Sequence, residues 1–168
     1  MYAVGDCVFY GTKGVCRVTE IGPSPFDKTD QRLFYVLKPV LTSSGDATIY
    51  TPVDGTAAKM RSLITRERAA ALLNAPREIG CLIIRMEKQR RDMYQEAMLS
   101  SDPVELMKIL NTVRLRRATA AESHKHLPNL DMEYEGRAKR CLLSEFSVVL
   151  GIAPAEVEAI LFGHAEGF

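Results

Sequence analysis

The chain of 168 residues is long enough for one domain or two small ones, and its hydrophobic content of 46% is typical of a globular protein. Lysine and arginine number 22 against 21 aspartate and glutamate, so the net charge of +1 provides no overall attraction to nucleic acid or membrane. No apolar run approaches the ~20 residues that span a bilayer, and the N-terminus lacks the basic and apolar regions of a signal peptide. We therefore expect a cytoplasmic protein without a membrane segment, whose charged partners are bound by local patches.

The four cysteines are scattered, without the Cys-x-x-Cys spacing of a metal site, and the histidines add no zinc-like pattern. They are Cys7, Cys16, Cys81 and Cys141. We predict that they are small buried hydrophobic residues and that the protein holds no metal and no cofactor. A thiol-dependent enzyme that pairs one cysteine with His124 or His126 is an open alternative without a sequence signature.

The first third of the chain consists of short runs rich in β-branched and aromatic residues, which favour strands. Glycine, proline and serine separate these runs at residues 11–14, 22–25 and 43–46. Five short strands with tight turns favour a small antiparallel β barrel. The predicted strands cover residues 7–10, 14–21, 33–37, 47–51 and 60–63.

After Thr65 the apolar spacing becomes helical, and several helix ends are marked. Thr65 is suited to cap the first helix, Asp102 followed by proline to begin the third, and Gly151 to end the fourth. The predicted helices cover 66–74, about 82–99, a third from Asp102 with Leu106, Leu110 and Val113 buried, about 131–150, and a last from Pro154. The predicted fold is therefore α+β and multi-domain: a β barrel over residues 1–65 and an all-α bundle over 66–168.

Basic residues are locally concentrated in the helical part, although the totals cancel. Arg85, Lys88 and Arg91 recur at every third position, which aligns side chains along one helix face. Such faces could contact a phosphate backbone, and the ordinary alternative is a solvated helix surface with intrahelical ion pairs. Met86 lies in this stretch and is either an apolar wedge for a DNA base step or a core residue.

Several segments share their order and spacing with one known family. In the first third these are Val4-Gly-Asp-Cys-Val-Phe-Tyr10, Gly14-Val-Cys-Arg-Val, Tyr35-Val-Leu-Lys38 and Ile49-Tyr-Thr-Pro52. In the helical part they include Leu99-Ser-Ser-Asp-Pro-Val-Glu-Leu106, Arg114-Leu-Arg-Arg117 and Arg137-Ala-Lys-Arg-Cys-Leu-Leu-Ser-Glu145. Together they resemble the CarD family of bacterial transcription regulators, whose N-terminal domain also occurs in transcription-repair coupling factors. The resemblance covers almost the whole chain.

The resemblance implies a Tudor-like (SH3-like) β domain that binds the β subunit of bacterial RNA polymerase. It also implies a helical domain that contacts promoter DNA just upstream of the melted region, without enzymatic activity or a small-molecule substrate. The polymerase-binding surface would lie around residues 30–55, where Tyr50 stands at a position at which some relatives carry arginine. The candidate polymerase-binding residues are Arg32, Tyr35, Tyr50 and Thr51.

In relatives a tryptophan near the start of the long helix wedges into the minor groove, but this chain has no tryptophan. Glu87 falls at that position, beside Met86, while Arg90 and Arg137 match basic positions that contact DNA in relatives. The candidate DNA-binding residues are Arg85, Met86, Lys88, Arg90, Arg91, Arg114, Arg117, Arg137 and Arg140. Contacts made only with the open promoter would stabilise it by mass action. A polymerase-binding adaptor without DNA contact is the main alternative.

Overall fold

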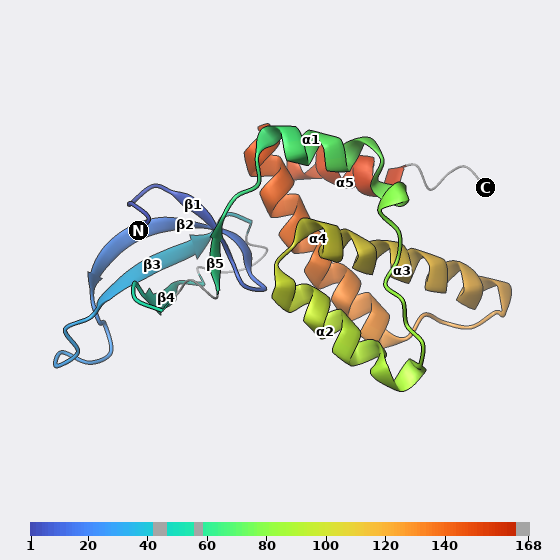
Figure 1. Ribbon diagram of the computed structural model, residues 1–168, viewed down its shortest axis with the longest axis horizontal. Coiled ribbons are helices and arrows are strands. Elements are labelled where there is room, and N and C mark those ends of the chain that lie inside the picture. The colour runs from blue at the N-terminus through green and yellow to red at the C-terminus, as the bar shows by residue number, and fades with distance from the viewer. Residues whose placement is uncertain (42–46, 56–58, 164–168) are drawn as a thin grey trace. The chain divides into compact units, whose positions relative to one another are not determined.

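The computed structural model describes residues 1–41, 47–55 and 59–163, and the predicted turn at 43–46 lies outside them. The chain divides into two compact units, Met1–Leu63 and Ile64–Phe168. Every strand of the described residues belongs to the first unit and every helix to the second (Figure 1). The predicted order of a β-rich part followed by a helical part is confirmed. Within the described residues, no helix has the combination of length and apolar composition that a membrane crossing requires.

A single antiparallel sheet forms the first unit, with the strand order β4-β3-β2-β1-β5. Its strands are β1 (Cys7–Tyr10), β2 (Gly14–Pro23), β3 (Leu33–Pro39), β4 (Ile49–Pro52) and β5 (Met60–Ser62). The long central strand β2 pairs with both β1 and β3, and its register shifts between Val18 and Glu20. In the described residues the edge strands β4 and β5 do not pair with each other. Closure into a barrel is therefore not confirmed, and the observed sheet is open.

One face of this sheet carries the core of the first unit. Side chains two positions apart in a strand share a face, and this spacing relates Cys16 to Val18 in β2 and Tyr35 to Leu37 in β3. The buried cluster comprises Val8, Cys16, Val18, Tyr35, Leu37 and Met60. Tyr35 is the largest of them, and its hydroxyl accepts a hydrogen bond of 3.0 Å from the Tyr2 backbone N–H.

Within residues 64–163, five α-helices and two short 3₁₀ helices form the second unit. They are α1 (Arg66–Asn74), η2 (Pro76–Ile79), η3 (Glu87–Gln89), α2 (Arg90–Ser100), α3 (Pro103–Glu122), α4 (Asn129–Leu150) and α5 (Pro154–Phe162). Thr65 Oγ1 accepts from the Arg68 N–H at 3.2 Å, and Asp102 Oδ1 accepts from the Val104 N–H at 2.8 Å. Gly151 ends α4 at φ 66°, a left-handed conformation that glycine adopts without strain. These three predicted helix ends are confirmed.

The start of α2 was predicted wrongly, because the helix begins at Arg90 rather than near residue 82. Side chains of α3 hold the preceding backbone in a non-helical path. Asn111 Nδ2 donates to the carbonyls of Pro76 and Gly80, both at 3.0 Å, and Thr112 Oγ1 accepts from the Leu82 N–H at 2.9 Å. These bonds hold the backbone at Pro76, Gly80 and Leu82 against α3, and residues 81–84 are not helical.

The two longest helices, α3 and α4, pack against each other and form the centre of the second unit (Figure 1). The predicted stripe of Leu106, Leu110 and Val113 on α3 is buried, as expected. Buried side chains from the other helices complete this core: Ala69, Leu73, Tyr94, Met98, Leu142, Phe146, Val157 and Leu161. A rigid two-helix centre therefore supports the segments that surround it.

Candidate functional site

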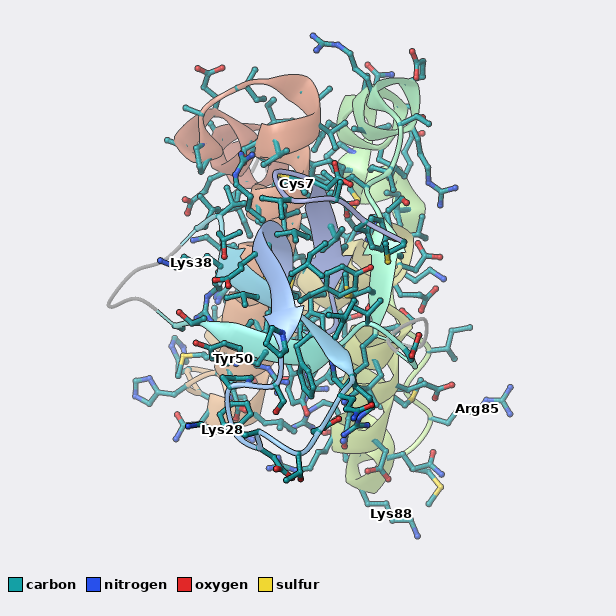
Figure 2. The ribbon with its side chains drawn as sticks, turned by 90° about the vertical axis from the view of Figure 1, so that its left-hand side faces the viewer. Cys7, Lys28, Lys38, Tyr50, Arg85 and Lys88 are labelled. Carbon is teal, nitrogen blue, oxygen red and sulfur yellow. The ribbon has the colours of Figure 1, made fainter. Side chains whose placement is uncertain are left out.

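An apolar patch is exposed at the edge of the sheet formed by β3 and β4. Phe26 is 75% exposed and Tyr50 40%, whereas the exposed Leu33 lies on the other face of β3, the face of Tyr35. The rings of Phe26 and Tyr50 meet edge to face, with centroids 5.3 Å apart. Figure 2 shows Tyr50 on this part of the sheet. This exposed aromatic pair is a candidate surface for binding another molecule.

A fixed cation accompanies this patch. Arg32 contacts Asp30 through two groups, Nη2 at 2.7 Å from Oδ2 and Nε at 2.9 Å from Oδ1. These hydrogen bonds lower the pKa of Asp30 to about 2. The Arg32 guanidinium also lies 5.7 Å from the centre of the Phe34 ring, and its side chain stays 60% exposed and accessible to a partner.

Two of the four candidate polymerase-binding residues require a correction. Tyr35 is 1% exposed and Thr51 is 5% exposed, and the two residues lie opposite each other in the register of β3 and β4. They face the core because neighbouring residues of a strand point to opposite faces, so Tyr50 and Thr51 cannot share one surface. Arg32 and Tyr50 are the accessible members of the predicted set.

Five candidate DNA-binding residues fall in the segment 85–91, which runs from a bend through η3 into the first turn of α2, and four of them are exposed. Arg85, Met86, Lys88 and Arg91 are exposed, and none of the three cations has an ion-pair partner among the described residues. Figure 2 shows Arg85 and Lys88 extending into solvent. Met86 is 46% exposed, so the alternative of a core residue is wrong. We call Arg85, Met86, Lys88 and Arg91 the basic tip.

The other candidate arginines are placed differently. Arg114 is turned inward, where its guanidinium donates to Asn111 Oδ1 at 3.2 Å and to the Leu161 carbonyl at 3.1 Å. Burial and the neighbouring Arg77 lower the pKa of Arg114. These contacts correct its assignment to a free basic surface, because its hydrogen bonds are already used within the fold.

Three further candidates lie on the surfaces of α3 and α4. Arg117 forms a bidentate ion pair with Glu135, while Arg137 lies 3.5 Å from Glu133 and 4.9 Å from the centre of the Tyr134 ring. Arg140 is exposed and has no ion-pair partner among the residues that the structure describes. A phosphate would have to compete with a carboxylate at Arg117 and at Arg137, but not at Arg140.

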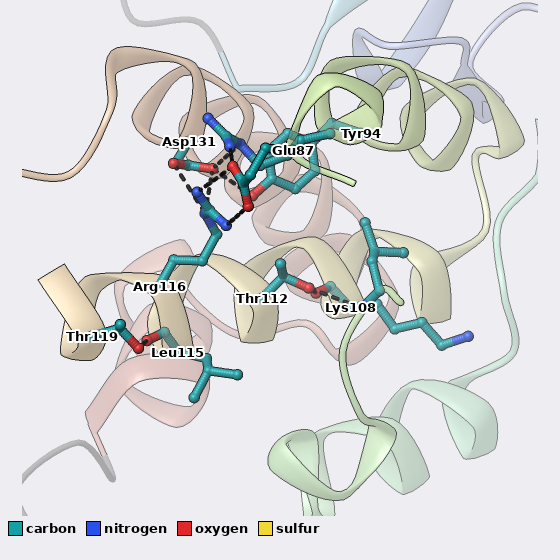
Figure 3. Close-up of polar contacts among 10 residues, drawn as sticks. Glu87, Tyr94, Lys108, Thr112, Leu115, Arg116, Thr119 and Asp131 are labelled. Carbon is teal, nitrogen blue, oxygen red and sulfur yellow. Dashed lines mark hydrogen bonds and ion pairs between the residues drawn. The ribbon is translucent and has the colours of Figure 1, made fainter. Parts of the chain in front are cut away.

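Arg90 belongs to a buried polar cluster centred on Asp131, which is fully buried in the first turn of α4. Tyr94 donates to Asp131 Oδ1 at 2.6 Å, and Arg116 Nε lies 3.3 Å from each carboxylate oxygen. Arg90 Nε lies 3.1 Å from Oδ1 as an ion pair without a directed hydrogen bond. Figure 3 shows how these groups converge. Arg90 is only 11% exposed, which corrects its assignment to a solvent-facing basic surface.

Glu87 covers this cluster from outside. Its carboxylate accepts from Arg116 Nη1 at 2.9 Å and Nη2 at 3.1 Å, and Arg90 Nη1 contacts the same group (Figure 3). The hydrogen bonds from Arg116 lower the pKa of Glu87, and burial together with the bond to Asp131 raises the pKa of Tyr94. Two arginines thus face two carboxylates, and the cluster is electrically balanced.

Sequence reasoning missed the partnership of Glu87, Tyr94, Arg116 and Asp131. The four residues come from η3, α2, α3 and α4, and their spacing carries no periodic signal. One weak signal was present, because an acidic residue in the first turn of a helix is favoured by the helix dipole, as Asp131 is. Its burial against two arginines depends on how the helices pack.

Residues 2–64 match the family model of the CarD-like/TRCF RID domain. These residues belong to that domain family. The match covers all five strands, and it confirms the resemblance to the CarD family over this part of the chain. The RID domain is an RNA polymerase-interacting domain, so the chain carries a module of the transcription apparatus. No curated protein matches the chain in sequence.

The residues that match the RID family carry the exposed pair of Phe26 and Tyr50, together with Arg32. Its β4 strand is an edge strand in the described residues, where unpaired backbone groups can bond to a partner. The accessible side chains and the edge strand therefore lie together within the residues that match this polymerase-interacting domain family.

The cysteines give no indication of catalysis or metal binding. Cys16 and Cys141 are buried, as predicted, and Cys7 is partly buried, whereas Cys81 is exposed. The prediction of burial is thus wrong for Cys81, which follows the non-helical turn at Gly80. Over residues 1–41, 47–55 and 59–163, histidines, cysteines and carboxylates form no group that could hold a metal ion.

Proposed function

We propose that this protein is a non-enzymatic transcription regulator that binds the β subunit of RNA polymerase through its RID domain. The match of residues 2–64 to the RID family carries this proposal. The apolar patch around Tyr50 and the fixed Arg32 provide a surface with the aromatic and arginine character of binding hot spots. The edge strand β4 adds backbone groups for pairing.

The helical unit would contact promoter DNA through the basic tip. Arg85, Lys88 and Arg91 are exposed cations, and Met86 is the exposed apolar side chain among them. Phosphate contacts of this kind position a protein without reading sequence, while an apolar side chain can support an unstacked base step. Contacts that form only with a bent or open promoter stabilise that state by the difference in affinity.

A polymerase-binding adaptor without DNA contact is the second candidate. It is favoured by the carboxylates that already neutralise Arg90, Arg116, Arg117 and Arg137. The two candidates predict different salt dependence, because only DNA binding releases counterions from the phosphate backbone. A protein that captures polymerase but shows no salt-dependent affinity for duplex DNA is the adaptor.

Replacing Tyr50 by alanine should weaken the binding of the full chain to the polymerase β subunit by about tenfold or more, since buried aromatic anchors dominate interfaces. Tyr50 is exposed in the free protein, so the melting temperature should stay close to that of the wild type. Lys13→Ala, in the exposed turn between β1 and β2, is the matched control. Equal binding by both variants in a direct affinity measurement would exclude the β3–β4 edge as the docking surface.

Replacing Met86 by alanine should shorten the lifetime of the open promoter complex and leave polymerase binding unchanged. The physical reason is that alanine offers less apolar surface to an unstacked base step. Because Met86 is 46% exposed, truncation should cost far less stability than the 2–5 kcal/mol typical of a buried methionine. Competitor-challenge assays measure the lifetime, and an unchanged lifetime would remove Met86 from the DNA-contacting set.

A further inference from the structure

Arg116 and Arg90 already present guanidinium donors in an arrangement that binds a carboxylate or a phosphate group. Arg116 presents Nη1 and Nη2 to one carboxylate at 2.9 and 3.1 Å, and Arg90 Nη1 approaches the same group from α2. A guanidinium fork of this kind binds phosphate oxygens as readily as carboxylate oxygens. The group that occupies the fork, Glu87, belongs to the chain itself (Figure 3).

The two arginines are held in place independently of Glu87. Asp131 is fully buried behind them, with Arg116 Nε at 3.3 Å and Arg90 Nε at 3.1 Å. Tyr94 donates to the same carboxylate at 2.6 Å and fixes its orientation. Because Asp131 neutralises only one of the two guanidiniums, the pair keeps one positive charge when Glu87 is absent. The site is therefore preorganised for one further negative group.

Glu87 is the least firmly held member of the cluster. Its side chain is 67% exposed, and it lies in a 3₁₀ helix of three residues whose start has no side-chain cap. Exposed ion pairs contribute little net stability, because water solvates the separated charges almost as well. The carboxylate can thus leave the arginines without disturbing the helices that carry them.

We propose that Arg116 and Arg90 form a binding site for one backbone phosphate of duplex DNA, and that Glu87 is the internal competitor that occupies it in the free protein. This inference rests on the proposed DNA-binding function and adds a self-masking contact to it. The site lies beside the basic tip, because Arg85 and Lys88 flank Glu87 in sequence and Arg91 follows Arg90. Phosphate binding then replaces the carboxylate and joins the site to the exposed cations.

The test compares Glu87→Gln with Glu96→Gln in duplex binding across a range of salt concentrations. Both variants remove one negative charge, and Glu96 is an exposed residue of α2 without an ion-pair partner among the described residues. Glu87→Gln should bind a promoter duplex about three- to tenfold more tightly than Glu96→Gln. Its salt slope should steepen by about 0.9, the value for one additional phosphate. Equal affinities and slopes would overturn the proposal.

A side-chain resonance provides a readout that does not depend on a variant folding well. On titration of the wild-type protein with duplex, the Nη–Hη signals of Arg116 should shift, because the partner of Nη1 and Nη2 changes from the Glu87 carboxylate to phosphate. The signal of Arg114, whose guanidinium bonds to the Leu161 carbonyl, should stay in place. An unmoved Arg116 signal at saturating DNA contradicts the masking site even if the protein binds DNA.

Duplex binding by the wild type and by Glu87→Gln distinguishes failure of the proposed DNA-binding function from failure of the masked site. If neither the wild type nor Glu87→Gln binds duplex at low salt, the DNA-binding function and the masked site both fail. If the wild type binds and Glu87→Gln binds no more tightly than Glu96→Gln, only the masked site fails. Binding by Glu87→Gln alone would support both, with Glu87 as a complete block.

Discussion

Reversing Arg85, Lys88 and Arg91 to glutamate together should weaken the binding of duplex DNA by about 100-fold at low salt and leave binding to polymerase unchanged. Each exposed cation can form one solvent-exposed ion pair with a phosphate, worth up to about 1 kcal/mol, and three such pairs account for an effect of this size. The slope of log affinity against log salt should fall by about 2.7, since each phosphate contact contributes about 0.9. Fluorescence anisotropy with a fixed promoter duplex at several salt concentrations measures both quantities.

The control reverses Lys13, Lys28 and Lys38, three exposed lysines of the RID domain, with the same change in net charge. General repulsion between a more acidic protein and DNA would affect both triple variants equally. Loss of a local contact at the basic tip would weaken DNA binding only in the variant with Arg85, Lys88 and Arg91 reversed. Similar losses of DNA affinity for the two variants would mean that Arg85, Lys88 and Arg91 make no local contact with DNA.

Replacing Asp131 by alanine should lower the free energy of unfolding by about 3–5 kcal/mol, because removal of one member of a buried ion pair leaves its partners uncompensated. Arg90 is 11% exposed and Arg116 26% exposed, and Tyr94 would lose the acceptor of its hydroxyl. Urea denaturation measures the loss. Asp131→Asn should cost less, since the amide oxygen can still accept from Tyr94.

Glu122→Ala is the control for this second experiment. Glu122 is exposed at the end of α3, so its removal should change stability by no more than about 0.5 kcal/mol. If Asp131→Ala were equally mild, the cluster would not be a structural support, and the preorganisation of Arg90 and Arg116 would need another source. A large loss at Asp131 with normal DNA affinity per folded molecule would separate stability from function.

The helix ends that the sequence predicted correctly are those determined by local chemistry. Thr65 and Asp102 cap helices with their own side chains, and Gly151 supplies a left-handed residue. These interactions join residues within a few positions of one another, so they are visible in the order of the amino acids. The irregular backbone that precedes η3 is held by distant contacts instead, because Asn111 and Thr112 bond to Pro76 and Leu82 from α3, and the local sequence does not show such contacts.

For the candidate site residues too, exposure is predictable where it depends on neighbours in sequence and not where it depends on how the helices pack. Strand alternation separates buried Thr51 from exposed Tyr50, and it could have been applied at the sequence level. The burial of Arg90 could not be predicted from the sequence, because its carboxylate partner lies on α4 and the neighbouring Arg116 lies on α3. A count of basic residues shows where cations are dense, but packing decides which of them remain free.

The irregular backbone between η2 and α2 is short between its two held positions. The Thr112 hydroxyl accepts from the Leu82 N–H, and the helical segment of η3 and α2 begins at Glu87, so only residues 83–86 lie between these two points. Four residues span at most roughly 14 Å when fully extended, and far less chain entropy is available to them than to a free loop. Arg85 and Met86 are therefore presented on a segment that is already largely ordered, and their association with a partner loses little conformational freedom.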